Sequence, residues 1–296
     1  MPAVKIERLM FTLLHVSDLH FGPPFLPAVG EALLRAAAAH RADVIVASGD
    51  FTQRARSTQF AEARAYLDRL PKVPLVVVPG NHDVPLFRII ERFVAPHAHY
   101  RRYISDELDT VLVRDNAVIV ALDTTAPRLT ITNGRIRRQP LDLCEQAFAK
   151  ARPGAARIVV AHHHFAPAPD YDNENDVMRG AKRALARFDE LQVDLILGGH
   201  LHRAYIGNSL DVYPMGDRAS GIIIEQCGTT TSRRGRARER EKNSFMYTTI
   251  DERTIHITQF MYFHDRDSFE PVSRHLYPRR GRHFLADGQA APDAQL

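Results

Sequence analysis

Short, mainly apolar runs alternate with longer amphipathic segments over the first two thirds of the chain. The apolar runs predict strands, and the Ala- and Leu-rich segments with apolar residues every three or four positions predict helices. The predicted strands are Met10–Val16, Val44–Ala47, Leu75–Val78, Ile158–Ala161 and Asp194–Leu197, and the predicted helices lie around Leu26–His40, Thr58–Leu70 and Val177–Leu191. This alternation of strands and helices predicts an α/β layered domain.

The pattern becomes richer in strands elsewhere. Thr110–Arg114 and Ala117–Leu122 predict a hairpin that turns at Asp115 and Asn116. The C-terminal third predicts a meander of strands at Ala204–Ile206, Ala219–Gln226, Ser244–Ile250 and Thr254–Phe263. Two mixed sheets packed against each other, with helices outside, would accommodate both patterns.

The totals describe an ordinary globular chain. It has 296 residues, of which 45% are hydrophobic and 25% are charged, and this length is sufficient for a large core without disulfides. We find no internal repeat and no linker, so residues 1–277 are predicted to form one domain. Residues 278–296 are rich in Arg, Gly and Ala without periodicity, and we expect them to be a disordered tail.

The cysteines and the net charge indicate where the protein is located and which partners it binds. The two cysteines, Cys144 in a predicted helix and Cys227 in a predicted strand, form no disulfide framework, so we expect a cytoplasmic location. Met1–Leu14 is interpreted as a first strand, not as a signal peptide, and no apolar stretch is long enough to predict a membrane span. The formal net charge of +4 is too small to predict nucleic-acid binding by itself.

The residues able to bind metals follow the predicted strands. They occur in five blocks, which are Asp18-Leu19-His20, Gly49-Asp50, Gly80-Asn81-His82-Asp83, Ala161-His162-His163-His164 and Gly198-Gly199-His200-Leu201-His202. Open α/β sheets gather their ligand-binding loops at the carboxyl ends of strands. The five blocks are therefore expected to meet at one edge of the molecule.

The spacing within the blocks suggests how cations are held. In Asp18-x-His20 and His200-x-His202, an extended chain would project both side chains of the pair to the same face. Asp50 has two oxygens and is able to join two cations about 4 Å apart. Asn81 adds a neutral oxygen. This nitrogen and oxygen set, without thiolate, suits Mn, Fe, Co, Ni or Zn better than a structural zinc site.

The five blocks, in this order, resemble the calcineurin-like metallophosphoesterase superfamily, whose pattern is D-x-H, G-D, G-N-H-[DE], H and G-H-x-H. The resemblance covers Asp18 to His202, and five blocks in order are far more specific than any one. The residues that flank two of the blocks also look like those of bacterial members related to class III cyclic-nucleotide phosphodiesterases. These segments are Val16-Ser17-Asp18-Leu19-His20-Phe21 and Pro79-Gly80-Asn81-His82-Asp83.

The resemblance implies a four-layer αββα sandwich with a dinuclear metal site at the carboxyl edge of its strands. One metal would be held by Asp18, His20, Asp50 and His202, and the other by Asp50, Asn81, His162 and His200. A hydroxide between the metals would attack phosphorus, and His82 would stabilise the phosphoryl oxygens or protonate the leaving group. Mn and Fe are the favoured metals, with Zn, Co or Ni as alternatives.

Several assignments remain open at this stage. His162 directly follows an apolar strand and is favoured over His163 as the ligand of the fourth block, while His163 and Arg54 are candidate substrate contacts. Many members of the superfamily carry an acid three residues after the residue that corresponds to Asp50, where this chain has Gln53. That difference weakens the expected acidity of His82. His15 is interpreted as a satisfied core residue.

The sequence therefore predicts a metal-dependent phosphodiesterase that acts on a small phosphate ester, with cyclic nucleotides favoured. Alternatives within the same chemistry are a nucleotide-lipid pyrophosphatase, a phosphoprotein phosphatase and a nuclease. The segment Phe87–Tyr103 is the expected insert over the site. A different class of function, a nucleic-acid-binding module, would use the basic loop Arg233–Arg240.

Overall fold

Twelve strands form two mixed sheets in the computed structural model of the chain, which describes residues 10–129, 132–167, 177–213, 221–236 and 239–279. The first sheet has the order β12-β11-β10-β1-β2-β3. Its strands are β1 (Phe11–Val16), β2 (Val44–Ala47), β3 (Leu75–Val77), β10 (Ser244–Ile250), β11 (Thr254–Phe263) and β12 (Ser268–Pro278). β1, β2 and β3 are parallel, and β10 joins β1 antiparallel.

The second sheet has the order β4-β5-β6-β7-β9-β8. Its strands are β4 (Thr110–Val113), β5 (Ala117–Leu122), β6 (Ala156–Ala161), β7 (Leu195–Gly198), β8 (Tyr205–Asn208) and β9 (Ile223–Gln226). β5, β6, β7 and β9 are parallel, and the outer strands β4 and β8 are antiparallel to their neighbours. The predicted hairpin is present, because β4 and β5 pair across Asp115 and Asn116.

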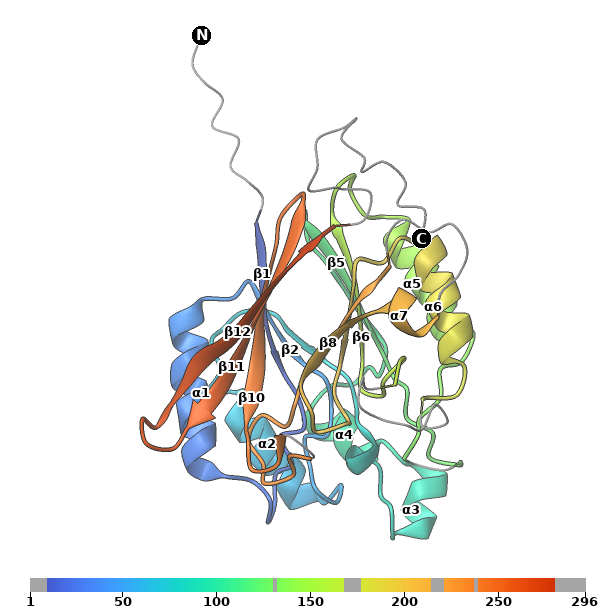
Figure 1. Cartoon of the computed structure of the whole chain (residues 1–296). Helices are drawn as coiled ribbons and strands as arrows, with labels where there is room; N and C mark the ends of the chain where they lie inside the picture. The colour runs from blue at the N-terminus through green and yellow to red at the C-terminus, as the bar shows by residue number, and fades with distance from the viewer. Residues whose placement is uncertain (1–9, 130–131, 168–176, 214–220, 237–238, 280–296) are drawn as a thin grey trace, which may run out of the picture.

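Helices cover the outer faces of both sheets (Figure 1). The helices of the described residues are α1 (Pro27–His40), α2 (Ser57–Leu67), α3 (Ile89–Val94), α4 (Ala98–Tyr103), α5 (Gln139–Phe148), α6 (Ala181–Glu190) and α7 (Ser209–Val212), with one 3₁₀ turn at Asn81–Asp83. The covering helices are α1, α2, α4, α5 and α6. Proline at the first turn suits the starts of α1 and α5, because its missing amide hydrogen is not needed there.

Three buried clusters define four layers. One cluster joins α1, α2 and α4 to the first sheet, and another joins α5 and α6 to the second sheet. The third lies between the sheets and contains apolar side chains from both, such as Leu13 and Val46 from one and Ile158 and Leu197 from the other. Central strands such as β1 and β5 are buried along their whole length, as expected for strands covered on both faces. The predicted αββα sandwich is confirmed.

The C-terminal strands depart from the predicted single meander. β8 and β9 belong to the second sheet, whereas β10 and β11 belong to the first, because the fully buried β9 pairs in parallel with β7. β12 was not predicted. It is an edge strand with many exposed polar residues and with Pro271 beside a bulge between Gln259 and Phe260, so it lacks the apolar alternation of a buried strand.

The predicted tail begins inside this sheet. Pro278 ends β12, and the next residue, Arg279, is buried and bonded to Asp194, while residues 280–296 lie outside the described residues. No helix in the described part of the chain combines the length and the apolar character needed to cross a bilayer.

Candidate metal centre

The candidate ligands lie in loops that follow the carboxyl ends of parallel strands. Asp18 and His20 follow β1, Asp50 follows β2, and Asn81 opens the turn after β3. These three strands are neighbours in the first sheet. The remaining ligands come from the second sheet, with His162 after β6 and His200 and His202 after β7. Packing of the two sheets brings all five loops together.

Five of these seven residues have left-handed backbone conformations. The φ angles of Asp18, His20, Asp50, His200 and His202 lie between 51° and 75°. Such angles are uncommon for residues other than glycine and are typical of functional sites. The predicted reason for convergence, an extended chain with alternating faces, is therefore wrong for both x-separated pairs. Each pair converges through tight turns instead.

Two glycines allow these loops to come close. A Cβ atom on Gly80 would lie 2.1 Å from the Asp50 carboxylate oxygen Oδ1, and one on Gly199 would lie 1.9 Å from Ser17 Oγ. No side chain fits at such distances. Glycine at these two positions therefore allows the backbone to approach the site closely.

Each of the two carboxylates has one oxygen fixed by a backbone amide. Asp50 Oδ1 accepts a 2.7 Å hydrogen bond from the amide of His82, and Asp18 Oδ2 accepts one of 3.0 Å from the amide of His200. The other oxygens, Asp50 Oδ2 and Asp18 Oδ1, are buried and have no hydrogen-bond partner within the described part of the chain. Buried acceptors without partners are costly, so a bound cation is the natural partner for them.

The first half of the site contains Asp18, His20, Asp50 and His202. One ligand atom from each lies within 4.8 Å of the others, and all four side chains are buried. His20 Nε2 lies 3.6 Å from Asp18 Oδ1 and 3.7 Å from Asp50 Oδ2. Neither ring nitrogen of His20 has a hydrogen-bond partner among the described residues. This donor set fits a borderline cation such as Mn, Fe or Zn.

The second half contains Asn81, His162 and His200, and it shares Asp50 with the first. Asn81 Oδ1 lies 3.2 Å from His162 Nε2 and 2.9 Å from His200 Nδ1. On the other side, His162 Nε2 lies 3.5 Å from Asp50 Oδ2. Asp50 Oδ2 is therefore placed between His20 and His162, where one oxygen is able to serve two cations.

His162 and His163 occupy different positions. His162 Nδ1 donates a 2.7 Å hydrogen bond to the Ser48 carbonyl, which directs Nε2 toward Asp50 and Asn81. A ring nitrogen fixed in this way is usual for a metal-binding histidine. His163 Nδ1 lies 2.8 Å from Thr124 Oγ1, and its ring also falls within a group of three with His162 and His200. The 3.5 Å contact of His162 Nε2 with Asp50 Oδ2 favours His162 as the ligand.

The comparisons with known proteins agree with this geometry. The sequence model described as calcineurin-like phosphoesterase matches residues 11–204. The chain belongs to the calcineurin-like phosphoesterase family. Membership of this family supports a metal-dependent phosphoester hydrolase. No curated protein matches the chain.

Solved structures share the fold at low identity. A purple acid phosphatase, PPD1, from yellow lupin (Lupinus luteus) seeds has a TM-score of 0.68 and 11% identity, covering 93% of this chain and 55% of that chain. The chain thus spans about half the length of that phosphatase. PhoD has a TM-score of 0.65 and 12% identity, and the match covers 89% of this chain and 72% of that chain. GAP50, the anchor in the inner membrane complex of Plasmodium, has a TM-score of 0.59 and 13% identity, and the match covers 92% of this chain and 90% of that chain.

The electrostatics of this calcineurin-like site keep its carboxylates ionised. Burial would raise the pKa of Asp50, but His162 and His82 hold it well below its usual range. Burial lowers the pKa of His162, yet Asp50 reverses the effect and brings the pKa to about 9. Burial and His163 hold the pKa of His200 well below its ordinary value. The carboxylates are thus ionised and His200 is neutral, whereas a cation would have to displace the proton of His162.

His82 is oriented by backbone, not by the side chain of Gln53. Its Nδ1 donates a 2.9 Å hydrogen bond to the Gln53 carbonyl, and burial lowers the pKa of its imidazole. The Gln53 side chain instead accepts a 2.9 Å hydrogen bond from the Arg234 guanidinium. Glutamine at this position thus serves to hold an arginine, a role that the sequence alone did not reveal.

A cavity of about 240 Å³ opens over the candidate ligands. It is lined by His82, His200, His202 and Asn81 on the metal side, and by Arg54, Arg234 and Arg236 around them. The predicted contact Arg54 therefore faces the cavity, whereas His163 is not among its described lining residues. The sequence marked Arg234 and Arg236 only as members of a basic run.

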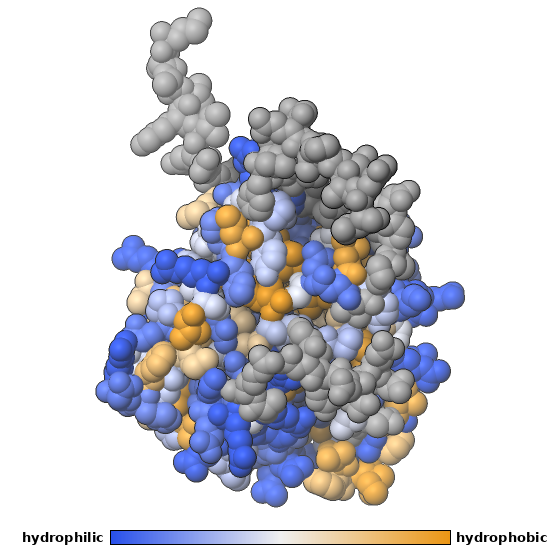
Figure 2. Space-filling view, in the orientation of Figure 1, coloured by the Kyte–Doolittle hydropathy of each residue, from blue (hydrophilic) through white to orange (hydrophobic). Residues whose placement is uncertain are grey.

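The predicted insert at Phe87–Tyr103 lies beside this cavity, with Phe87 against Arg54, but does not line it. No described residue of that segment lines it, although Val84 and Leu86 just before it do. α4 turns inward and buries Tyr100 in the core. α3 buries none of its residues and leaves Ile90 81% exposed, and Figure 2 shows apolar side chains gathered over it at the lower right.

Proposed function

We propose that this chain is a two-metal phosphodiesterase with the ligand set given above. One cation would bind Asp18, His20, Asp50 and His202, and the other Asp50, Asn81, His162 and His200. The observation that carries the proposal is the position of Asp50 Oδ2, which is buried without a partner in the described structure and lies 3.7 Å from His20 and 3.5 Å from His162. Mn and Fe are the proposed metals, with Zn, Co or Ni as alternatives.

When bound, the two cations supply an activated water and neutralise the phosphate. Side chains of the protein would orient the substrate and assist departure of the leaving group. The Gln53 carbonyl engages Nδ1 of His82, so Nε2 would be the atom that contacts the phosphoryl oxygens or the leaving group. Because burial lowers the pKa of His82, the protonated form is scarce at neutral pH. The proposed enzyme therefore favours substrates with good leaving groups.

Arg234 is the proposed phosphate contact. Burial lowers the pKa of its guanidinium, while Asp50 and Asp18 counteract this effect and keep the charge in place. The Gln53 side chain fixes its direction, and the group lines the cavity beside His82. A held guanidinium provides two parallel donors for phosphate oxygens. Arg54 lines the same cavity, with its guanidinium 5.0 Å from the Phe87 ring centroid.

The cavity favours a small substrate. Its volume of about 240 Å³ lies below the range of about 300–1,000 Å³ that is typical of small-molecule sites, and three arginines line it. We therefore propose a small nucleotide phosphodiester, with cyclic nucleotides first. A nucleotide-lipid, a phosphoprotein and a nucleic acid are the alternatives. Because Arg234 and Arg236 of the basic loop line the cavity, the loop is better suited to a substrate phosphate than to a nucleic-acid surface. The proposed compartment is the cytoplasm, supported by two buried free thiols.

Hydrolysis of bis(p-nitrophenyl) phosphate tests the proposal. The full chain is stripped with a chelator and reloaded with Mn, and metal content is measured alongside the rate. We expect two metal ions per chain, loss of activity on chelation, and a rate at least about 100-fold lower in Asp50→Ala and His200→Ala. His264→Ala and Asp265→Ala are matched controls, because both residues are exposed in the turn between β11 and β12. Full activity in Asp50→Ala would remove the two-metal mechanism.

A substrate panel tests the finer proposal. The same Mn-loaded protein is assayed with cyclic nucleotides, a nucleotide-lipid, a phosphopeptide and a short RNA. The proposal expects the highest kcat/KM for cyclic nucleotides. RNA binding that weakens steeply with salt and that disappears when Arg233, Arg236 and Arg240 are replaced would favour the nucleic-acid module instead.

A further inference from the structure

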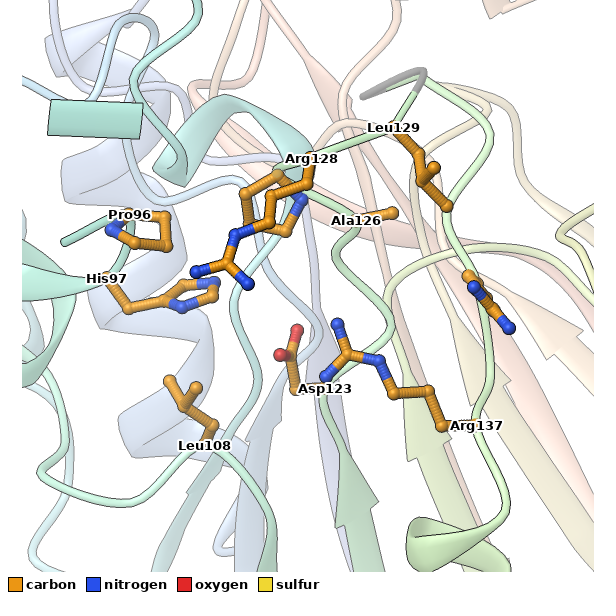
Figure 3. Close-up of a pocket in the computed structure, with 10 residues that line it drawn as sticks. Pro96, His97, Leu108, Asp123, Ala126, Arg128, Leu129 and Arg137 are labelled. Atoms are coloured by element: carbon orange, nitrogen blue, oxygen red, sulfur yellow. The ribbon is translucent and has the colours of Figure 1, made fainter. Parts of the chain in front are cut away.

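A second cavity, of about 410 Å³, lies apart from the metal centre (Figure 3). It is formed between the start of α4, the loop after β5 and the segment that leads into α5. Its lining includes three arginines, Arg128, Arg135 and Arg137, with His97 and Asp123. It shares no described lining residue with the cavity over the metal centre. It is therefore a separate place where a ligand is able to bind.

The three arginines around this cavity form no ion pairs with described residues. In the described part of the chain, none of the three takes part in an ion pair, and Arg128 makes only a long 3.5 Å hydrogen bond to the Phe93 carbonyl. Unpaired guanidinium groups are common on an open surface, but three of them around one cavity repel one another. An anion in the cavity would relieve that repulsion.

The two other ionisable groups of the lining offset only part of this positive charge, through the interaction of Asp123 with Arg137. Asp123 Oδ1 is already engaged by the amide and hydroxyl of Thr125, at 2.8 and 2.7 Å, and burial raises the pKa of its carboxyl. His97 Nε2 lies 2.8 Å from Thr125 Oγ1, and burial lowers the pKa of its imidazole to about 4. His97 is thus neutral near pH 7, and the lining carries three positive charges against at most one negative charge.

Figure 3 shows how two of the arginines are directed. Arg128 and Arg137 reach from two sides toward the space beside Asp123. The rest of the wall is apolar and includes Leu108, Ala126 and Pro127. Such a cavity combines an anion-binding side with an apolar side, so it suits a ligand that has both a charged group and an organic body.

We propose that this cavity is a second ligand site, which binds a small organic phosphate monoester through Arg128, Arg135 and Arg137. Guanidinium groups pair with phosphate oxygens through parallel donors, and a monoester dianion matches the excess charge of the lining. A single carboxylate would be satisfied by one arginine. The apolar wall would hold the organic part, which inorganic phosphate lacks.

The neighbouring metal centre determines how the site is tested. The Thr124 hydroxyl, next to Asp123, lies 2.8 Å from His163 Nδ1, and a binding assay alone does not report which of the two cavities holds the ligand. Variants in each cavity are therefore compared. Arg137→Gln and Arg128→Gln report on the proposed site, and Arg234→Gln reports on the cavity over the metal centre. Arg138→Gln is the matched control, because Arg138 is exposed, adjacent to Arg137 and absent from the lining.

The experiment measures binding of adenosine 5′-monophosphate to the full, metal-free chain by titration calorimetry at constant ionic strength. We expect the tightest site to bind at least about tenfold more weakly in Arg137→Gln and in Arg128→Gln and to keep its affinity in Arg138→Gln, whereas Arg234→Gln should affect only a weaker site in the cavity over the metal centre. Adenosine should not bind, and inorganic phosphate should bind more weakly than the monophosphate. Thermal unfolding verifies that each variant is folded.

Four results would overturn the proposal. The first is that adenosine 5′-monophosphate does not bind at all, and the second is that Arg138→Gln weakens binding as much as Arg137→Gln does, which would indicate general electrostatic attraction. The third is loss of binding in Arg234→Gln alone, which would assign the ligand to the metal-centre cavity. Equal affinity for adenosine would also contradict recognition through phosphate.

Discussion

The two candidate carboxylate ligands divide their oxygens in the same way. Asp50 gives one oxygen to the amide of His82, and Asp18 gives one to the amide of His200, so each acid is fixed by the loop that carries another member of the site. The second oxygen of each is left inside the site. At the level of single residues, the backbone therefore fixes the acids, and the side chains remain available for cations.

Replacing Arg234 by glutamine tests the proposed phosphate contact. Loss of a charge-assisted hydrogen bond costs about 1.5–3 kcal/mol, so kcat/KM for bis(p-nitrophenyl) phosphate should fall about tenfold to 100-fold. Metal content should stay the same, because Arg234 is not a proposed ligand. Arg233→Gln is the control, since Arg233 is exposed and its side chain makes no contact recorded among the described residues. Equal losses in both variants would mean that only the overall charge of the loop matters.

At this scale the sequence predicted residue identities better than conformations. All seven predicted metal ligands lie together, because the order of the blocks fixes which strand each one follows. The left-handed φ angles of Asp18, His20 and the others were not predicted, since they arise from tertiary contacts between loops. The pairing of Gln53 with Arg234 was also missed, because it joins positions 181 residues apart.

Among the elements, the loops after β2 and β3 are tied together by Asp83. Its Oδ2 accepts hydrogen bonds from the amides of Gly80 and Phe51, at 2.9 and 3.2 Å, and its Oδ1 accepts one of 2.9 Å from the amide of Thr52. Asp83 is buried, and burial with the neighbouring Asp50 raises the pKa of its carboxyl to about 7. This side chain acts as a brace between the strand ends and not as a ligand.

Replacing Asp83 by alanine should remove the hydrogen bonds that hold the loops after β2 and β3 together. Several buried amides would lose their acceptor, so the free energy of unfolding should fall by about 3 kcal/mol in urea denaturation. Because the loops of Asp50 and Asn81 would no longer be held together, affinity for Mn should fall about tenfold or more. Asp115→Ala removes an exposed acid and should change neither quantity. Normal metal affinity in Asp83→Ala would contradict the bracing role.

The sequence predicted central elements and missed peripheral ones. β1, β2, β5 and β6 are buried along their length, so their apolar runs are nearly continuous and easy to recognise. β12 is an exposed edge strand, and α3 buries no side chain, so neither has a strong pattern. The assignment of β8 and β9 to the second sheet depends on packing between distant segments, which periodicity does not report.

Across the whole molecule, polar contacts join the two sheets at both ends of their interface. His15 of β1 is fully buried, with Nδ1 2.7 Å from the Glu225 carboxylate of β9 and Nε2 2.8 Å from Ser48 Oγ. The prediction of a satisfied core histidine agrees with these contacts. Buried groups of this kind are tolerated only when all of them find partners, so the network specifies how the sheets are aligned.

Arg279 makes the second connection. It follows β12 of the first sheet and pairs with Asp194, which precedes β7 of the second, with Nη2 3.1 Å from the Asp194 oxygen Oδ2. Its other donors reach the carbonyls of Gly154, Ala155 and Asp251. Both partners of the ion pair are nearly buried, at 10% and 6% side-chain exposure. Solvent therefore screens this pair far less than the exposed ones.

Removing Arg279 should destabilise the packing of one sheet on the other. In Arg279→Ala the Asp194 carboxylate and three carbonyls lose their donor, and breaking a buried pair costs about 3–5 kcal/mol. Urea denaturation should show that loss in the free energy of unfolding. The value for Arg279→Lys should lie between those of Arg279→Ala and the unmodified chain, because an ammonium group reaches fewer of the four acceptor groups. Arg274→Ala, on the exposed face of β12, should stay within about 0.5 kcal/mol of the unmodified chain. If Arg279→Ala unfolds at the same urea concentration as Arg274→Ala, the contacts of Arg279 do not contribute to holding the sheets together.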